Sequence, residues 1–143
     1  MRHRKKGRKL NRSGGARRAL FKNLLTSFFL EEKLTTTLAK AKSIQGKIDS
    51  LINRAKKNNL VDRRFIYAYL NKKESARHLI EEVAPRFAKR DSGCTRILKM
   101  GRRRGDQALM ARLVLVEKIE KQLTSKKSNK KPKESKKLKK NEK

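Results

Sequence analysis

The chain has 143 residues, which is enough for one domain and a tail but too few for two full hydrophobic cores. Lys and Arg number 43 against 13 Asp and Glu, so the formal net charge is +30. A compact free monomer with this charge repels itself unless a polyanion neutralises it, and nucleic-acid phosphate is the commonest cellular polyanion. Aromatic residues make up 5% of the chain and Trp is absent, so base stacking is not expected to be the main mode of binding. The composition predicts an RNA- or DNA-binding protein that recognises backbone and shape.

The cysteine content and the length of the apolar segments indicate the cellular compartment of the protein. Cys94 is the single Cys, so no intramolecular disulfide can form and a reducing cytosol is expected. We interpret Cys94 as a small, partly buried hydrophobic residue, because no His lies nearby in the sequence to activate its thiol. The most apolar stretch, residues 24–30, is interrupted by Thr26 and Ser27 and is much shorter than a membrane span. We therefore expect no membrane partner.

Residues 1–12 form a basic arm that contains no acidic residue. Leu10 is its one apolar residue after Met1, so no core is expected to hold this segment, which should be disordered until it meets phosphate. Arg suits this role because a guanidinium group can bind phosphate through two hydrogen bonds. The predicted RNA-binding residues of the arm are Arg2, His3, Arg4, Lys5, Lys6, Arg8, Lys9 and Arg12.

The folded domain is predicted to span residues 13–117 and to begin with a helix capped by Ser13. The apolar residues of this helix recur as adjacent pairs every four residues, the spacing of an amphipathic helix that packs on a core. The pairs are Leu20-Phe21, Leu24-Leu25 and Phe28-Phe29. On the opposite side, Arg17, Arg18 and Lys22 are predicted to continue the RNA-binding surface of the arm.

Three consecutive Thr residues predict a short strand over residues 32–37 that ends in a helix cap at Thr36 or Thr37. A second helix is predicted to run to about Lys57, with Lys40 and Lys42 among its RNA-binding residues. A short third helix capped by Asp62 and a fourth helix ended by Pro85 complete the helical part.

Residues 94–100 and 109–116 are rich in aliphatic and β-branched side chains, and Gly101 to Asp106 separate them. This pattern predicts two antiparallel strands joined by a hairpin, with residues 113–116 as the candidate for a central strand. The hairpin places three Arg residues on one exposed turn, where phosphate would offset their mutual repulsion. The predicted RNA-binding residues of this region are Arg96, Arg102, Arg103 and Arg104.

Residues 118–143 form a tail composed mainly of Lys, Ser, Asn and Glu. No hydrophobic pattern survives beyond Ser125, so we interpret the tail as a low-complexity polycation. Because it is rich in Lys rather than Arg, diffuse electrostatic attachment is expected rather than fixed contacts.

No pattern in the sequence predicts catalysis or a bound cofactor. There is no Ser-His-Asp set, no pair of catalytic carboxylates and no phosphate-binding glycine loop, and His78 has no second ligand at metal spacing. Zinc-finger and basic-zipper spacings are also missing. We expect a protein that is not an enzyme and that takes no metal, no cofactor and no small-molecule substrate.

Four segments of the chain resemble one known family. They are MRHRKKGRKLNR at 1–12, ARRALFKNL at 16–24, KLTTTLAKAK at 33–42 and TRILKMGRRRGDQALMA at 95–111. In this order they are similar to bacterial large-subunit ribosomal protein number seventeen. The resemblance implies an α+β fold in which about four helices pack on a small mixed sheet of three strands. It also implies binding to large-subunit ribosomal RNA near the polypeptide exit tunnel, beside other ribosomal proteins.

The resemblance begins at residue 1, so the expected location is the cytoplasmic ribosome, with a mitochondrial or plastid ribosome as the alternative. Two rival classes share the high charge. A free RNA chaperone or nucleoid-type protein would not require the specific arm and hairpin, and a membrane-active protein would need an exposed apolar helix face. Sedimentation with the large ribosomal subunit at high salt separates these three classes.

Overall fold

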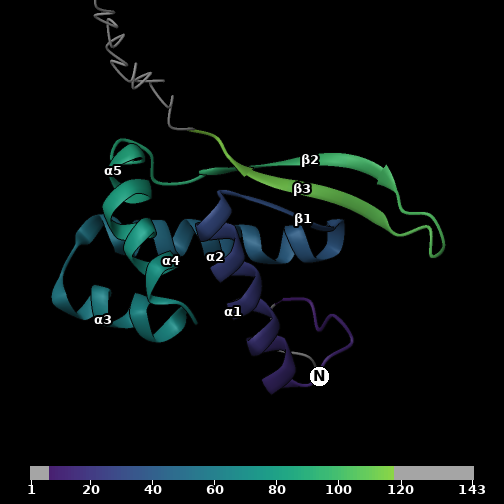
Figure 1. Cartoon of the computed structure of the whole chain (residues 1–143), viewed down its shortest axis with the longest axis horizontal. Coiled ribbons are helices and arrows are strands. Elements are labelled where there is room, and N and C mark those ends of the chain that lie inside the picture. The colour runs from purple at the N-terminus through teal and green to yellow at the C-terminus, as the bar shows by residue number, and fades with distance from the viewer. Residues whose placement is uncertain (1–6, 118–143) are drawn as a thin grey trace, which may run out of the picture.

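The computed structural model describes residues 7–117, which form a layer of helices covered on one side by a three-stranded sheet (Figure 1). The remainder of the predicted arm, residues 1–6, and the predicted tail, residues 118–143, lie outside the described residues.

The sheet contains β1 (Lys33–Thr37), β2 (Thr95–Arg102) and β3 (Leu109–Leu115) in the order β1-β3-β2. The last strand of the chain therefore lies in the centre, as its run of aliphatic residues predicted. Both pairings are antiparallel, so the expectation of a mixed sheet is wrong. The hairpin makes β2 and β3 run in opposite directions, and β1 meets the other edge of β3 in the same direction as β2. The α+β class with helices on one face of the sheet is confirmed.

Two long helices cover the inner face of this sheet. In α1 (Gly14–Glu31), the side chain of Ser13 accepts a hydrogen bond from the Ala16 amide at 3.4 Å, which confirms the predicted N-cap. The helix α2 (Leu38–Lys57) begins directly after β1 with Thr37 as its N-cap residue. It ends at Asn58, whose backbone is left-handed with φ of 52°, a conformation that Asn tolerates better than most residues. The boundaries of α2 are therefore those that the sequence predicted.

The remaining helices differ in detail from the prediction. The cap residue of α3 (Leu60–Tyr69) is Asn59 rather than Asp62, because Asp62 lies in the first turn and pairs with Arg54 at 3.5 Å. The fourth helix consists of α4 (Lys73–His78), the π-helical segment η1 (Leu79–Val83) and α5 (Ala84–Arg86). It extends one residue past Pro85, which directly follows the π-helical segment as the second residue of α5.

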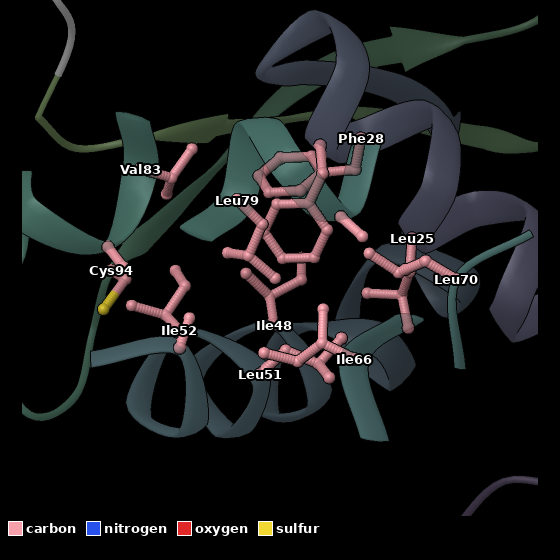
Figure 2. Close-up of a cluster of buried hydrophobic side chains, with 14 of the residues drawn as sticks. Leu25, Phe28, Ile48, Leu51, Ile52, Ile66, Leu70, Leu79, Val83 and Cys94 are labelled. Carbon is pink, nitrogen blue, oxygen red and sulfur yellow. The ribbon is translucent and has the colours of Figure 1, made fainter. Parts of the chain in front are cut away.

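The core lies between α1, α2 and the fourth helix, with the sheet closing it from the other side (Figure 2). Phe28 and Phe29 are fully buried and meet edge to face with ring centroids 5.4 Å apart. Leu113 and Leu115 of β3 supply the sheet's contribution. Cys94 is also fully buried, as expected of a small hydrophobic residue, and burial raises the pKa of its thiol to about 11.

Arg86 joins three parts of the fold through its guanidinium group. It donates hydrogen bonds to both carboxylate oxygens of Glu32 after α1, to the Glu82 carbonyl at 2.9 Å and to the Glu117 carbonyl after β3 at 3.3 Å. The Arg86 side chain is 14% exposed, so water competes poorly for these donors. We refer to Arg86 with Glu32, Glu82 and Glu117 as the Arg86 clasp.

Within residues 7–117, no helix is both long and apolar enough to cross a membrane. Over the same residues, no three His, Cys, Asp or Glu side chains gather closely enough to hold a metal ion.

Candidate nucleic-acid interface

The described part of the arm begins beside α1 and is not detached from the fold. Leu10 is half-buried and packs against the hydrophobic core, and the Arg12 amide closes a turn by bonding the Lys9 carbonyl at 3.2 Å. The expectation that no core holds this segment is therefore wrong at Leu10, because one aliphatic side chain is enough to anchor a short turn. The predicted cations Arg8, Lys9 and Arg12 remain exposed. The predicted residues Arg2, His3, Arg4, Lys5 and Lys6 lie outside the described residues.

The predicted cations of α1 and α2 do not all face solvent. Arg18 and Lys42 are exposed, whereas Arg17 and Lys40 are half-buried. Lys22 turns toward α3, where its ammonium group donates a hydrogen bond to the Ala68 carbonyl at 3.3 Å and lies 5.9 Å from the centre of the Tyr69 ring. The Lys22 ammonium group therefore stabilises the packing of α3 on α1.

The hairpin is shaped by one irregular step in its strands. β2 pairs with β3 through Lys99–Ala111 and then Gly101–Met110, so Met100 is an extra residue that forms a β-bulge. Gly101 has φ of +97°, a conformation that L side chains rarely adopt. Beyond the bulge, residues 103–108 form the hairpin loop, which the Arg103 amide closes by bonding the Ala108 carbonyl at 2.9 Å.

The three predicted Arg residues of the hairpin have different environments. Arg102 and Arg104 are exposed. The Arg103 guanidinium instead forms a two-pronged pair with Asp106, with Nε–Oδ1 at 3.1 Å and Nη2–Oδ2 at 2.6 Å. Asp106 also accepts a hydrogen bond from the Ala108 amide at 3.2 Å. The pair therefore fixes the shape of the loop, while Arg102 and Arg104 point their charges outward from it.

The Arg103–Asp106 pair holds the pKa of the Asp106 carboxyl well below its usual range, at about 2, chiefly through the hydrogen bond from Arg103 and then that from Ala108. A carboxyl whose pKa is lowered on folding stabilises the folded form above its unfolded pKa and loses that contribution as the pH falls toward 2. Near neutral pH the carboxylate is fully ionised, so the shape of the loop should not depend on pH in that range.

Asp106→Asn tests whether the shape of the loop matters for binding. Simple charge counting predicts tighter RNA binding for this variant, because the net charge rises by one. We expect weaker binding, by a few-fold, because the two-pronged pair is lost and the loop must be ordered on docking. Titration of large-subunit ribosomal RNA with both proteins at one salt concentration measures the difference. Tighter binding by the variant would contradict the ordering role of Asp106.

Negative charge is distributed unevenly over the described residues. Residues 7–30, 33–48 and 95–116 contain one carboxylate, that of Asp106, and it is paired with Arg103. Most other described carboxylates belong to the helices that follow α2, or to the segments beside them. They are Asp62, Glu74, Glu81, Glu82, Asp91 and Glu117.

This distribution gives the domain a basic end. In the view of Figure 1, the tip of the hairpin, the start of α2 and residues 7–12 all lie toward one end, whereas α3, α4 and α5 lie toward the other. We refer to residues 7–18, the first turns of α2 and the hairpin as the basic end. The fold thus gathers cations from three separate parts of the sequence, an arrangement that favours contact with a polyanion.

The sequence analysis missed three exposed strand cations, Lys33, Lys99 and Arg112, and the first and last of these share one face of the sheet. Lys33 and Arg112 are exposed, and both lie on the same face of the sheet as the predicted residue Arg96, because Lys33 and Arg96 both pair with Val114. Arg112 could have been predicted from the sequence, because side chains alternate along a strand and its neighbours Ala111 and Leu113 are the buried ones.

Comparison with known proteins gives the same family that the four matching sequence segments at 1–12, 16–24, 33–42 and 95–111 indicated. The family model described as "Ribosomal protein L17" matches residues 20–116. A relative from Halothermothrix orenii, the large ribosomal subunit protein bL17, is 46% identical over 110 residues, which cover 77% of this chain and 96% of the relative. The match includes α1 from residue 20 onward, all three strands and the hairpin. On this evidence the chain belongs to the ribosomal protein L17 family.

Proposed function

We propose that the protein is a structural constituent of the large ribosomal subunit and binds large-subunit ribosomal RNA through its arm and hairpin. Membership of the L17 family supports the first part, because the relative from Halothermothrix orenii is named as a protein of that subunit. The basic end supports the second part, which is RNA binding through the arm and the hairpin. Its cations come from three segments that contain no carboxylate other than the paired Asp106, so a polyanion meets little repulsion there.

Each part of the chain has a role in this proposal. The arm at residues 1–12 and the hairpin bind phosphate, the domain at residues 13–117 holds them at one end of a rigid core, and the tail at residues 118–143 adds diffuse attraction. The position near the polypeptide exit tunnel of the cytoplasmic ribosome, beside other ribosomal proteins, rests on the family resemblance. Residues whose charges are already used within the fold, such as Lys22 and Arg103, contribute less than the exposed cations.

Sedimentation of a cell lysate through sucrose at high salt tests the structural role. A constituent of the large subunit stays with that subunit, because many contacts and neighbouring proteins hold it. A free RNA chaperone or nucleoid-type protein would be released, because its binding depends mainly on screened charge. Recovery of the protein at the top of the gradient would contradict the proposal.

The isolated protein should bind RNA with a steep dependence on salt. Each phosphate that the protein neutralises contributes roughly −0.7 to −0.9 to the slope of log affinity against log salt concentration. Binding of large-subunit ribosomal RNA measured between about 50 and 200 mM salt should therefore weaken by orders of magnitude if six or more phosphates are contacted. A slope near zero would mean that phosphate contacts do not drive the association.

A further inference from the structure

The sheet has one face that the helices do not cover. Helices lie on one side of the sheet only in Figure 1, and the buried residues Ala111, Leu113 and Leu115 mark that inner side of β3. Side chains alternate along a strand, so the residues between them and their cross-strand partners form the opposite face. We refer to this as the outer sheet face. Its residues are Lys33, Thr35 and Thr37 of β1, Arg96 and Leu98 of β2, and Met110, Arg112 and Val114 of β3.

The outer sheet face is more apolar than a solvated face needs to be. Antiparallel sheets with one face in water usually place polar side chains on that face. Here Leu98 is 45% exposed, and Met100 at the bulge beside it is 50% exposed. Met110 and Val114 are half-buried in the centre of the same face. An exposed group of aliphatic side chains on a sheet indicates a surface that is covered by a partner.

The charges on this face indicate which kind of partner fits. Lys33 and Arg96 flank Val114 from the two outer strands, so their backbones lie about 10 Å apart across the sheet. Arg112 lies on the central strand, where its Nε donates to the Thr35 hydroxyl at 3.4 Å. The three described strands contain no carboxylate at all. A surface of this charge is complementary to a polyanion.

We propose that the outer sheet face is a second RNA-docking surface, continuous with the hairpin and placed against the same ribosomal RNA. The inference rests on the proposed function, because it adds a surface to the same complex. The wide, shallow minor groove of an RNA helix presents ribose and 2′-hydroxyl groups to a broad surface. Leu98, Met110 and Val114 contact the riboses, Thr35 offers a hydroxyl for a 2′-hydroxyl, and the three cations hold the flanking phosphates.

A thiol placed on the outer sheet face tests this proposal. Leu98→Cys introduces an exposed thiol, while the native Cys94 is fully buried and its pKa is raised to about 11, so it reacts slowly. Ala88→Cys serves as the matched control, because Ala88 is exposed just after α5, at the opposite end from the hairpin. Maleimide labelling rates are measured in the free full-length protein, in its complex with purified large-subunit ribosomal RNA, and in the assembled subunit.

We expect the thiol from Leu98→Cys to react at least ten times more slowly in both the RNA complex and the subunit than in the free protein. The control thiol should keep its free rate in the RNA complex. Protection of the Leu98→Cys thiol only in the assembled subunit would mean that a protein covers this face, and would overturn the proposal. Undiminished reactivity in both, or equal protection of both thiols by RNA, would also overturn it.

These outcomes are separable from failure of the proposed function. If the unsubstituted protein binds the RNA and sediments with the large subunit while the Leu98→Cys thiol stays reactive, the proposed function stands and the outer sheet face is not an RNA surface. If the unsubstituted protein neither binds the RNA nor sediments with the subunit, the proposed function itself fails and the docking surface fails with it.

Discussion

Replacement of both Arg102 and Arg104 by Ala should lower the affinity for large-subunit ribosomal RNA by roughly 30- to 150-fold, since the charge-assisted hydrogen bonds that each side chain makes to phosphate are worth about 1–1.5 kcal/mol. Both side chains are exposed on a loop whose shape is already set by the Arg103–Asp106 pair. They therefore dock with little additional ordering of the backbone. The slope of log affinity against log salt concentration should also fall in magnitude by about 1.5 if both groups meet phosphate.

Arg63→Ala with Arg64→Ala is the matched control for this prediction. It removes the same charge from exposed positions on α3, away from the basic end, and should change the affinity far less. Replacement of Arg102 and Arg104 by Lys keeps the charge but loses the two-pronged geometry, so an intermediate affinity is expected. Equal loss from the loop and α3 pairs would show that position is irrelevant and that only net charge matters.

Loss of Arg86 should have the largest effect on stability outside the apolar core. Arg86→Ala removes the hydrogen bonds that join Glu32, Glu82 and Glu117, and it takes the guanidinium group away from the Glu32 carboxylate, which is 23% exposed and keeps His78 at 3.5 Å. Breaking one side of a largely buried ion pair costs about 2–4 kcal/mol after allowance for its partial exposure. The free energy of unfolding should fall by this amount in a denaturant titration, with little change in the slope.

Arg77→Ala provides the control for the Arg86 clasp. Arg77 pairs with Glu81 one helical turn away at 3.0 Å, but both side chains are more than half exposed, so water and salt already compete with this pair. Its loss should leave the unfolding midpoint nearly unchanged. Similar destabilisation by the two variants would mean that the clasp contributes no more than a surface ion pair.

The helices and strands were largely predictable from the sequence, because their signals are local. The pairs of apolar residues in α1, the Thr run of β1 and the aliphatic run of β3 each reflect side chains that face one core. The Ser13 cap and the Asn58 end are likewise decided by one residue and its immediate neighbours. Such features need no knowledge of the distant parts of the chain.

The features that sequence analysis missed depend on contacts between distant or irregular segments. Most hydrogen bonds of the Arg86 clasp join residues that are far apart in the sequence, since Arg86 lies 54 positions from Glu32 and 31 positions from Glu117. The contact of Lys22 with α3 likewise spans 46 positions. In the hairpin, the pairing of Arg103 with Asp106 depends on positive φ angles at Gly105 and Gln107, so the composition of the loop alone could not distinguish Arg103 from its neighbours.

The order of the strands also constrains when the protein becomes able to bind. β3 is the last strand to be made, yet it lies between β1 and β2 and supplies the partner for each of them. A chain that stops before Leu109 therefore has no sheet, no closed hairpin and no outer sheet face, whatever its helices have formed. Synthesis must therefore pass nearly the whole domain before the closed hairpin and the outer sheet face, two of the three proposed RNA-binding surfaces, can form.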